Sequence, residues 1–441
     1  MQNQKPLAEF SHYVSLSVFG MIAMSCYILA DTFFVAQGLG TNGLAALNLA
    51  VPAYNFIHGL GLMLGMGGAT KFSIYKSQGE EKNSNSIYTH TLYLSAFFSL
   101  IFMAMGLFCS EPLARLLGAD AAVFEMTNTY LKVMLLFAPA FILNDVFLCF
   151  VRNDGNPRLS MIATVSSSLF NIVFDYVFIF PCGMGIFGAI LATGLAPVVG
   201  VVVMAPHWMR KQKGFHLIRT RIQAGMIGAN LSLGFPSLLA QLSSGIVMIT
   251  FNSLILPLEG NTGVAAYGVI ANISLVVLSV YTGIAQGAQP LVSQAYGQNR
   301  PKAVVQFLRY SMLSMLAFSL VVYVILFVFA DPIARIFNAE NSAALQEIAV
   351  TGLKLYFISI PFAGFNIVLS THFTSIERAI PAHILSLLRS LALVLPMAIV
   401  LSALWGMTGI WLTLPVTELV VAALGLILYK KPSKGLKNQY T

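Results

Sequence analysis

Charged side chains are scarce in this chain of 441 residues. Lys, Arg, Asp and Glu together make up only 9% of it, whereas a soluble globular domain carries about 25%. Hydrophobic residues account for 57%, and the mean hydropathy is +0.80. So little charge cannot cover a water-facing surface, and the composition therefore indicates a protein embedded in a membrane.

The residue patterns that support catalysis are also missing. The four cysteines, Cys26, Cys109, Cys149 and Cys182, are scattered and lie in or beside apolar runs. No pair has metal-ligand spacing, so we expect them to be small core residues. There is no glycine-rich phosphate loop ending in Lys-Ser/Thr, which excludes a built-in ATPase. No metal cluster or nucleophile–base arrangement is visible, so we expect neither an enzyme nor a bound cofactor.

Apolar runs of 18 or more residues recur along the whole chain. Each can cross a hydrocarbon core about 30 Å thick as a helix, whereas a membrane β-barrel would show short alternating segments. The sequence thus predicts an all-α integral membrane protein with twelve transmembrane helices. We place these at 12–36, 46–70, 88–108, 127–150, 159–180, 185–208, 226–256, 264–296, 305–329, 349–373, 382–402 and 407–429.

The connections between these helices alternate in charge. Nineteen of the 24 Lys and Arg residues fall on one side of the membrane, and four fall on the other. Because basic loops stay in the cytoplasm, we expect both termini there, in a multi-pass protein of the bacterial cytoplasmic (inner) membrane. The net charge of +8 therefore reflects topology, and we expect no nucleic-acid partner.

The chain contains an internal repeat. Glu111-Pro112-Leu113-Ala114-Arg115-Leu116 reappears 220 residues later as Asp331-Pro332-Ile333-Ala334-Arg335-Ile336, and Gly79 is matched with Gly297 at an offset of 218. Six helices in each half make this a parallel repeat of two pseudo-symmetric six-helix bundles. We expect an N-lobe at 1–208, a basic cytoplasmic linker at 209–225, and a C-lobe with a short basic tail at 226–441. Such repeats are typical of transporters.

Four acids lie within apolar runs, where a charge costs at least ~2.5–3.5 kcal/mol. Asp31 and Asp175 are each about five residues from the outer end of an outward-running helix, so both lie roughly 8 Å below the outer boundary. Asn171 is one turn before Asp175, and Thr193 is roughly 12 Å deep in the next helix. Two carboxylates, an amide and a hydroxyl at one depth suit a hard monovalent cation or a shared proton. A polar network that only joins helices is the alternative.

Other buried polar residues have simpler interpretations. We expect Asp145 to form an interfacial ion pair close to Arg152, Asp154 and Arg158, and Arg389 to form a structural pair with Glu418. Amides in the second half could line a polar cavity or join helices. Our candidates for a substrate cavity are Tyr54, Asn55, Met63, Gln241, Asn272 and Gln286.

Several segments resemble the multidrug and toxic compound extrusion (MATE) family. They are Ala30-Asp31-Thr32-Phe33-Phe34-Val35, Asn171-Ile172-Val173-Phe174-Asp175, Gly188-Ala189-Ile190-Leu191-Ala192-Thr193, and the loop Arg152-Asn153-Asp154-Gly155-Asn156-Pro157. Their order and spacing cover about residues 10–430. Acids that one family branch carries in helices 7 and 10 are absent, which favours the DinF-type and MepA-type branch.

The resemblance implies two lobes in a V shape, alternating access, and antiport of organic, often cationic drugs against H⁺ or Na⁺. It assigns the coupling ion to Asp31, Asn171, Asp175 and Thr193. Expected partners are small-molecule drugs or organic cations and membrane lipids, and the expected state is a monomer. An exporter or flippase of a specific metabolite or lipid-linked precursor is the alternative function. A membrane-embedded enzyme or receptor is a third, against which the missing catalytic residues count.

Overall fold

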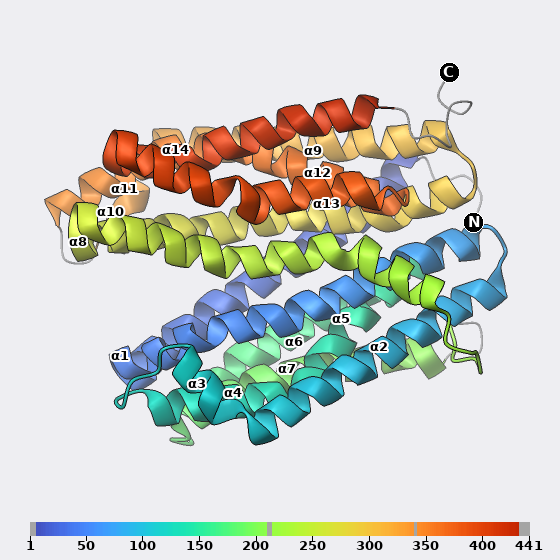
Figure 1. Cartoon of the computed structure of the whole chain (residues 1–441), viewed down its shortest axis with the longest axis horizontal. Helices are drawn as coiled ribbons and strands as arrows, with labels where there is room; N and C mark the ends of the chain where they lie inside the picture. Colours follow the sequence, from blue (N-terminus) through green and yellow to red (C-terminus); the bar gives the residue numbers. More distant parts are fainter. Residues whose placement is uncertain (1–5, 210–213, 339–341, 432–441) are drawn as a thin grey trace. The chain divides into compact units, whose positions relative to one another are not determined.

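The computed structural model describes residues 6–209, 214–338 and 342–431. The basic tail predicted after the last helix and residues 210–213 of the predicted linker lie outside the described residues. Regular structure in these ranges is entirely helical (Figure 1). The helices are α1 (Pro6–Ser77), α2 (Glu81–Phe108), α3 (Ser110–Leu116), α4 (Phe124–Leu136), α5 (Ala138–Asn153), α6 (Pro157–Ile179), α7 (Gly185–Met209), α8 (Ala224–Gly297), α9 (Pro301–Val328), α10 (Ala330–Phe337), α11 (Ala343–Tyr356), α12 (Ile360–Ser375), α13 (Ala379–Leu387) and α14 (Val394–Lys430).

The two longest helices each fold back on themselves at a glycine. Tyr27 and Tyr54 would lie about 40 Å apart on a straight helix, yet their hydroxyls are 2.6 Å apart. The chain reverses between them at Gly40, where φ is 65° and ψ is −158°. Gly260 in α8 and Gly406 in α14 have nearly the same backbone angles. This region of φ/ψ space is essentially restricted to glycine.

These reversals bear on the number of membrane spans. Eight helical stretches are long and apolar enough to cross a membrane, and α4 with α5, bent by 49°, can form a ninth. Three of the eight contain a reversal, so each of them can supply two spans. The described ranges can thus hold the twelve spans that the sequence predicts, and that number stays a prediction. Many large apolar side chains face outward, among them Leu100 and Leu320, as expected for surfaces that contact lipid.

The chain separates into two compact units. Unit 2 contains Ser15–Leu242 and Tyr296–Gln298, and unit 1 contains the described parts of Met1–Val14, Ser243–Ala295 and Asn299–Thr441. The start of α8 therefore packs with the first-half helices. The predicted lobe boundaries at 208 and 226 stay a prediction.

Left-handed backbone turns reveal the repeat more clearly than the sequence does. Eight of the ten positive φ angles in the described residues form pairs at nearly constant offset, namely Gly40 with Gly260, Gly79 with Asn299, Gly155 with Glu377, and Gly185 with Gly406. The turn equivalent to Gly79 is thus at Asn299, not at Gly297. Similarly, the short helices α3 and α10 carry the two copies of the acidic-Pro-x-Ala-Arg motif.

Close glycine contacts hold the helices of unit 2 together. A Cβ at Gly67 would lie 2.0 Å from the Asn230 carbonyl oxygen, and one at Gly65 would lie 3.0 Å from the Asp145 carbonyl oxygen. The glycine-rich stretch inside α1 therefore permits close packing. Around it lies an apolar core that includes Leu64, Phe72 and Phe150. The cysteine interpretation was wrong for three of the four residues, because only Cys149 is buried.

The extended segment 214–223 lies along the polar beginning of α2. Its backbone N–H groups donate to side chains there, from His216 to Asn85 Oδ1 at 2.9 Å and from Gln223 to His90 Nε2 at 2.9 Å. Gly214 N–H donates to Asp154 Oδ2 at 2.9 Å. Asp154, in the loop after α5, also accepts hydrogen bonds from His207 and Lys76. This part of the predicted linker is therefore bound to unit 2.

The reversal at Gly260 can be tested against a neighbouring glycine of the same helix. A Cβ at Gly260 or at Gly268 would meet no atom within 4 Å, but only Gly260 has positive φ. We expect Gly260→Ala to lower the free energy of unfolding by about 1–3 kcal/mol through backbone strain alone. Gly268→Ala should be neutral or stabilise by up to ~1 kcal/mol. Unfolding in detergent measures both, and equal effects would contradict the assignment.

Asp154 provides a test of the bound linker. Burial raises the pKa of this carboxyl, but hydrogen bonds from His207 and Lys76, the Lys76 charge and the Gly214 N–H outweigh burial and leave the pKa below its ordinary value. Ionised Asp154 therefore stabilises the folded protein at pH values above the pKa that this carboxyl has in the unfolded chain, which is ~3.9. The stabilisation is lost as the pH falls through the lower pKa of the folded protein.

We expect Asp154→Asn to cost about 1.5–3 kcal/mol of stability at pH 6–8, with the deficit shrinking below pH ~4. Asp331→Asn is the matched control, because Asp331 forms an exposed pair with Arg335 that is worth about 0–1 kcal/mol. A deficit for Asp154→Asn no larger than that of the control would mean that the linker contact contributes nothing.

Candidate functional site

Unit 2 brings the four predicted cation ligands together from three helices. The reversal at Gly40 divides α1 into a first limb before it and a second limb after it. Asp31 lies on the first limb of α1, and Asn171 and Asp175 lie one turn apart on α6. Thr193 lies on α7, which packs along α6. Asn171 and Asp175 are completely buried, and Asp31 and Thr193 are 9% and 5% exposed. The equal depth expected from the sequence therefore corresponds to a real juxtaposition.

Direct contacts link these side chains. The Asn171 Nδ2 donates to Thr193 Oγ1 at 3.2 Å. The Asp31 and Asp175 carboxyls are close enough to interact electrostatically. The Tyr130 hydroxyl of α4, which was not among the predicted ligands, adjoins Thr193. An isolated tyrosine in an apolar run gives no sequence signal for this role.

Four acceptor oxygens of this site lack donors. Asp31 Oδ1, Asn171 Oδ1 and both carboxylate oxygens of Asp175 are buried and have no hydrogen-bond partner among the described residues. Buried polar atoms are almost always paired, since leaving one unpaired is costly. An oxygen-only set with two carboxylates, an amide and a hydroxyl fits a hard cation such as Na⁺ or a proton held between carboxyls. The described residues contain no group of three His, Cys, Asp or Glu that could hold a metal ion.

A second buried polar cluster lies nearby in unit 2. His58 Nδ1 on α1 is 2.7 Å from Asp145 Oδ2 on α5. The prediction that Asp145 pairs at the interface close to Arg152 was therefore wrong. Arg152 instead donates to Cys149 Sγ. Gly61 is the residue in the sequence that could have indicated this contact. A Cβ at Gly61 would lie 2.6 Å from Asp145 Oδ2, so α5 can approach α1 this closely only because the side chain is absent.

A cavity of about 60 Å³ adjoins both clusters. Its polar lining includes Tyr27, His58, Asp145 and Thr193. Of the predicted cavity residues, Tyr54 lines it. Asn55, Met63 and Gln241 lie elsewhere in unit 2, and Asn272 and Gln286 lie in unit 1. A role for these five in substrate binding stays a prediction.

Unit 1 contains the expected pair of Arg389 and Glu418. The Arg389 Nη2 is 2.9 Å from Glu418 Oε1, and Asn366 Nδ2 donates to Glu418 Oε2 at 2.7 Å. Arg389 lies in a π-helical turn at Leu388–Ala392, a local deformation of the kind that often accompanies buried polar groups. Because Glu418 has donors on both oxygens, this pair resembles a structural contact more than an ion site.

The fold and site together define a class. A bundle of membrane-spanning helices, built from two related halves and enclosing buried ionisable groups without any catalytic arrangement in the described residues, is a multi-pass membrane transporter. The sequence model of the MatE family matches residues 17–177 and 236–400, one stretch in each half. The chain therefore belongs to the MatE family of transporters, and it is not an enzyme.

Curated relatives and solved structures agree with this assignment. The chain is 25% identical over 419 residues to the multidrug export protein MepA of Staphylococcus saprophyticus, covering 95% of this chain and 92% of the relative. It is 24% identical over 421 residues to MepA of Staphylococcus aureus, with the same shares covered. An outward-facing multidrug resistance MATE family transporter matches with a TM-score of 0.90, 24% identity and coverage of 96% and 95%. The structural match shows the fold.

The pair of Arg389 and Glu418 in unit 1 gives a prediction that distinguishes a role in stability from a role in transport. Glu418→Gln leaves the partly buried Arg389 charge, whose side chain is 16% exposed, without its partner. We therefore expect a loss of about 1.5–3 kcal/mol in unfolding free energy. Replacing both residues, as in Arg389→Met with Glu418→Leu, should recover most of that loss. Stability and efflux should be measured for each variant. A double variant that is stable but transports nothing would contradict a purely structural pair.

Proposed function

We propose that this transporter is a secondary active exporter of amphipathic, often cationic small molecules, driven by H⁺ or Na⁺ entering at Asp31, Asn171, Asp175 and Thr193. The observation that supports this most strongly is the set of buried acceptor oxygens that have no hydrogen-bond donor. Two carboxylates facing each other in a buried site repel when both are ionised. That state must therefore take up a proton or a monovalent cation.

Coupling follows from the helices that carry the ligands. Asp31 belongs to the first limb of α1, which is continuous up to the reversal at Gly40, whereas Asp175 belongs to α6. A bound cation attracts both carboxylates and holds α1 against α6, and its release lets them repel. Asn171 and Thr193 form the fixed side of the site, since they hydrogen-bond each other. Cation binding thereby favours one of two arrangements of the helices, which is what alternating access requires.

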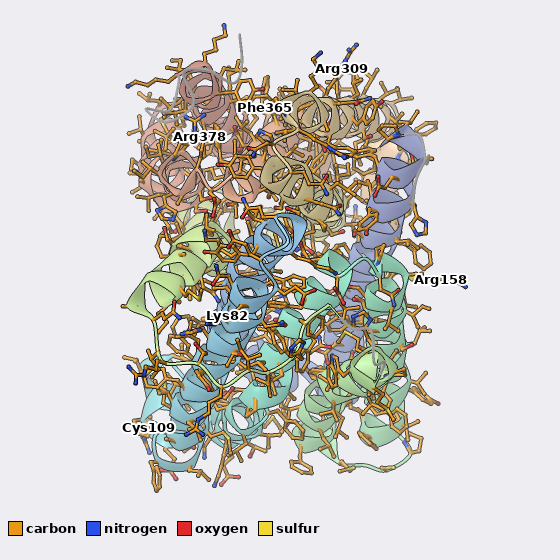
Figure 2. The ribbon with its side chains drawn as sticks, turned by 90° about the vertical axis from the view of Figure 1, so that its right-hand side faces the viewer. Lys82, Cys109, Arg158, Arg309, Phe365 and Arg378 are labelled. Atoms are coloured by element: carbon orange, nitrogen blue, oxygen red, sulfur yellow. The ribbon has the colours of Figure 1, made fainter. Side chains whose placement is uncertain are left out.

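The orientation we propose has both termini in the cytoplasm of a bacterial cell, with the protein a monomer in the cytoplasmic membrane. Lys82 and Arg158 lie toward the same end of unit 2, and Arg309 and Arg378 lie toward one end of unit 1 (Figure 2). Grouped basic residues at one end of each unit agree with cytoplasmic placement. The proposed lobes are 1–208 and 226–441.

Drug-like substrates are proposed because the curated relatives carry the name multidrug export protein. The aromatic and polar lining of the unit 2 cavity supports such substrates, since Tyr27, Tyr54 and Phe141 offer ring faces beside Asp145. Aromatic faces and a carboxylate attract organic cations.

We expect Asp31→Asn and Asp175→Asn to reduce gradient-driven efflux of ethidium at least about tenfold, a loss of roughly 1.4 kcal/mol of coupling or more. Efflux should be followed in cells lacking their own pumps, at equal expression, under an imposed pH or Na⁺ gradient. Glu81→Gln, at an exposed position of α2, is the matched control and should transport as wild type does.

A second measurement follows the exchange of ethidium across the membrane of vesicles that contain the protein, with no ion gradient imposed. It reports substrate binding and movement without coupling. Asp31→Asn should keep exchange while losing uphill transport, because it removes coupling and not substrate binding. Undiminished uphill transport by Asp31→Asn would overturn the cation site. If wild type exports no dye at all, a specific metabolite or lipid-linked precursor becomes the better substrate.

A further inference from the structure

The pair of His58 and Asp145 is not accounted for by the cation site. The two side chains are 2.7 Å apart and are 7% and 4% exposed. They lie on the second limb of α1 and on α5, whereas the acids of the cation site lie on the first limb of α1 and on α6. A buried carboxylate and an imidazole inside a membrane protein are costly, so a role beyond packing is the default expectation.

Two glycines of α1 permit the close contact between Asp145 and this helix. Gly61 follows His58 by three residues, and Gly65 follows by seven. Cβ atoms at these positions would lie 2.6 Å from Asp145 Oδ2 and 3.0 Å from its carbonyl oxygen. Any larger residue at Gly61 would push the carboxylate away, so the close approach depends on these glycines.

The charge on the cavity wall depends on this pair. Among the described residues that line the cavity, Asp145 and His58 are the ionisable groups apart from the two tyrosine hydroxyls. With His58 protonated, the pair is neutral overall. With His58 neutral, the cavity carries the single negative charge of Asp145. One proton therefore switches the cavity between a neutral and an anionic state.

Aromatic rings surround the switchable charge. Tyr54 stacks on His58 with ring centroids 5.8 Å apart, and Phe141 meets Tyr54 edge-on at 5.7 Å. The Tyr54 hydroxyl is 2.6 Å from the Tyr27 hydroxyl. An anionic carboxylate beside aromatic faces is a suitable environment for an organic cation.

Other ionisable groups face the pair from neighbouring elements. Tyr27, and Asp31 one turn further along, are on the first limb of α1, Tyr54 is on the second limb, and Cys149 is one turn after Asp145 on α5. Asn144, Ser167, Ser168 and Thr193 line the cavity without being ionisable. Thr193 also contacts Asn171 of the cation site, so the two sites adjoin while using different carboxylates.

We propose that Asp145 binds the cationic group of the exported molecule, and that His58 is a protonatable competitor for the same carboxylate. A protonated His58 neutralises Asp145 and keeps the organic cation out. When the cation binds, His58 gives up one proton to solvent and remains as the neutral imidazole. This inference rests on the proposed function in its choice of ligand, and it adds a second point at which protons and substrate exchange.

Ethidium, a permanent cation, is the probe, and its binding to purified full-length protein is measured by fluorescence from pH 5.5 to 8.5. The Asp31→Asn background leaves Asp175 as the single carboxyl of the cation site and so removes the proton shared between the two acids. In that background we expect binding to be about tenfold or more weaker at pH 5.5 than at pH 8.5. His58→Gln should abolish this pH dependence while keeping the high-pH affinity. Asp145→Asn should bind about tenfold or more weakly at every pH.

Calorimetry in buffers of different ionisation enthalpy measures the number of protons released when ethidium binds. This measurement does not require substitution of His58. In the Asp31→Asn background, ethidium binding should release up to one proton near the midpoint of the pH curve. No proton release, unchanged pH dependence in His58→Gln, or full affinity in Asp145→Asn would each overturn the proposal. The two proposals fail separately, because uphill transport by Asp31→Asn tests only the cation site and these binding curves test only the His58–Asp145 pair.

Discussion

Hydrogen-bond donors are almost absent from the interior of a bilayer, and this constraint shapes the whole molecule. Backbone groups must be paired within each span, which is why the described regular structure is entirely helical. Side chains that accept hydrogen bonds must find donors on neighbouring helices. Thr193 finds such a donor on Asn171, and Glu418 finds one on Asn366. Carboxylate oxygens on Asp31 and Asp175 find none among the described residues, and a bound cation would satisfy them.

The two halves share a backbone plan but differ in polar chemistry. Left-handed turns recur at offsets of 220 to 222 residues, including the reversals at Gly40 and Gly260. In contrast, the position 220 residues after Asp31 is Phe251, which is completely buried. Unit 1 instead holds Glu418, whose carboxylate is held by Arg389 and Asn366. The repeat thus preserves the features that determine chain direction, while the buried carboxylates without a hydrogen-bond donor lie, among the described residues, in unit 2.

Much of the fold and part of the site could be predicted from the chain alone. Apolar run length predicts twelve spans because a bilayer has one thickness, and depth along a helix follows from its constant rise. The proximity of Asp31 and Asp175 follows from equal depth. The contact between His58 and Asp145 could not be predicted, because it depends on which faces of α1 and α5 meet. Cys26, Cys109 and Cys182 were misplaced for the same reason, since lipid-facing and core-facing positions are equally apolar.

The sequence by itself determined the membrane class, the repeat and the depth of the buried acids. Each of these depends on quantities that run along the chain, namely length, hydropathy and helical rise. Only the tertiary structure decided which polar atoms are left without donors, that Asp145 pairs with His58, and that segment 214–223 is bound to α2. These depend on helix rotation and on close approach at glycines such as Gly61, which a one-dimensional pattern does not specify.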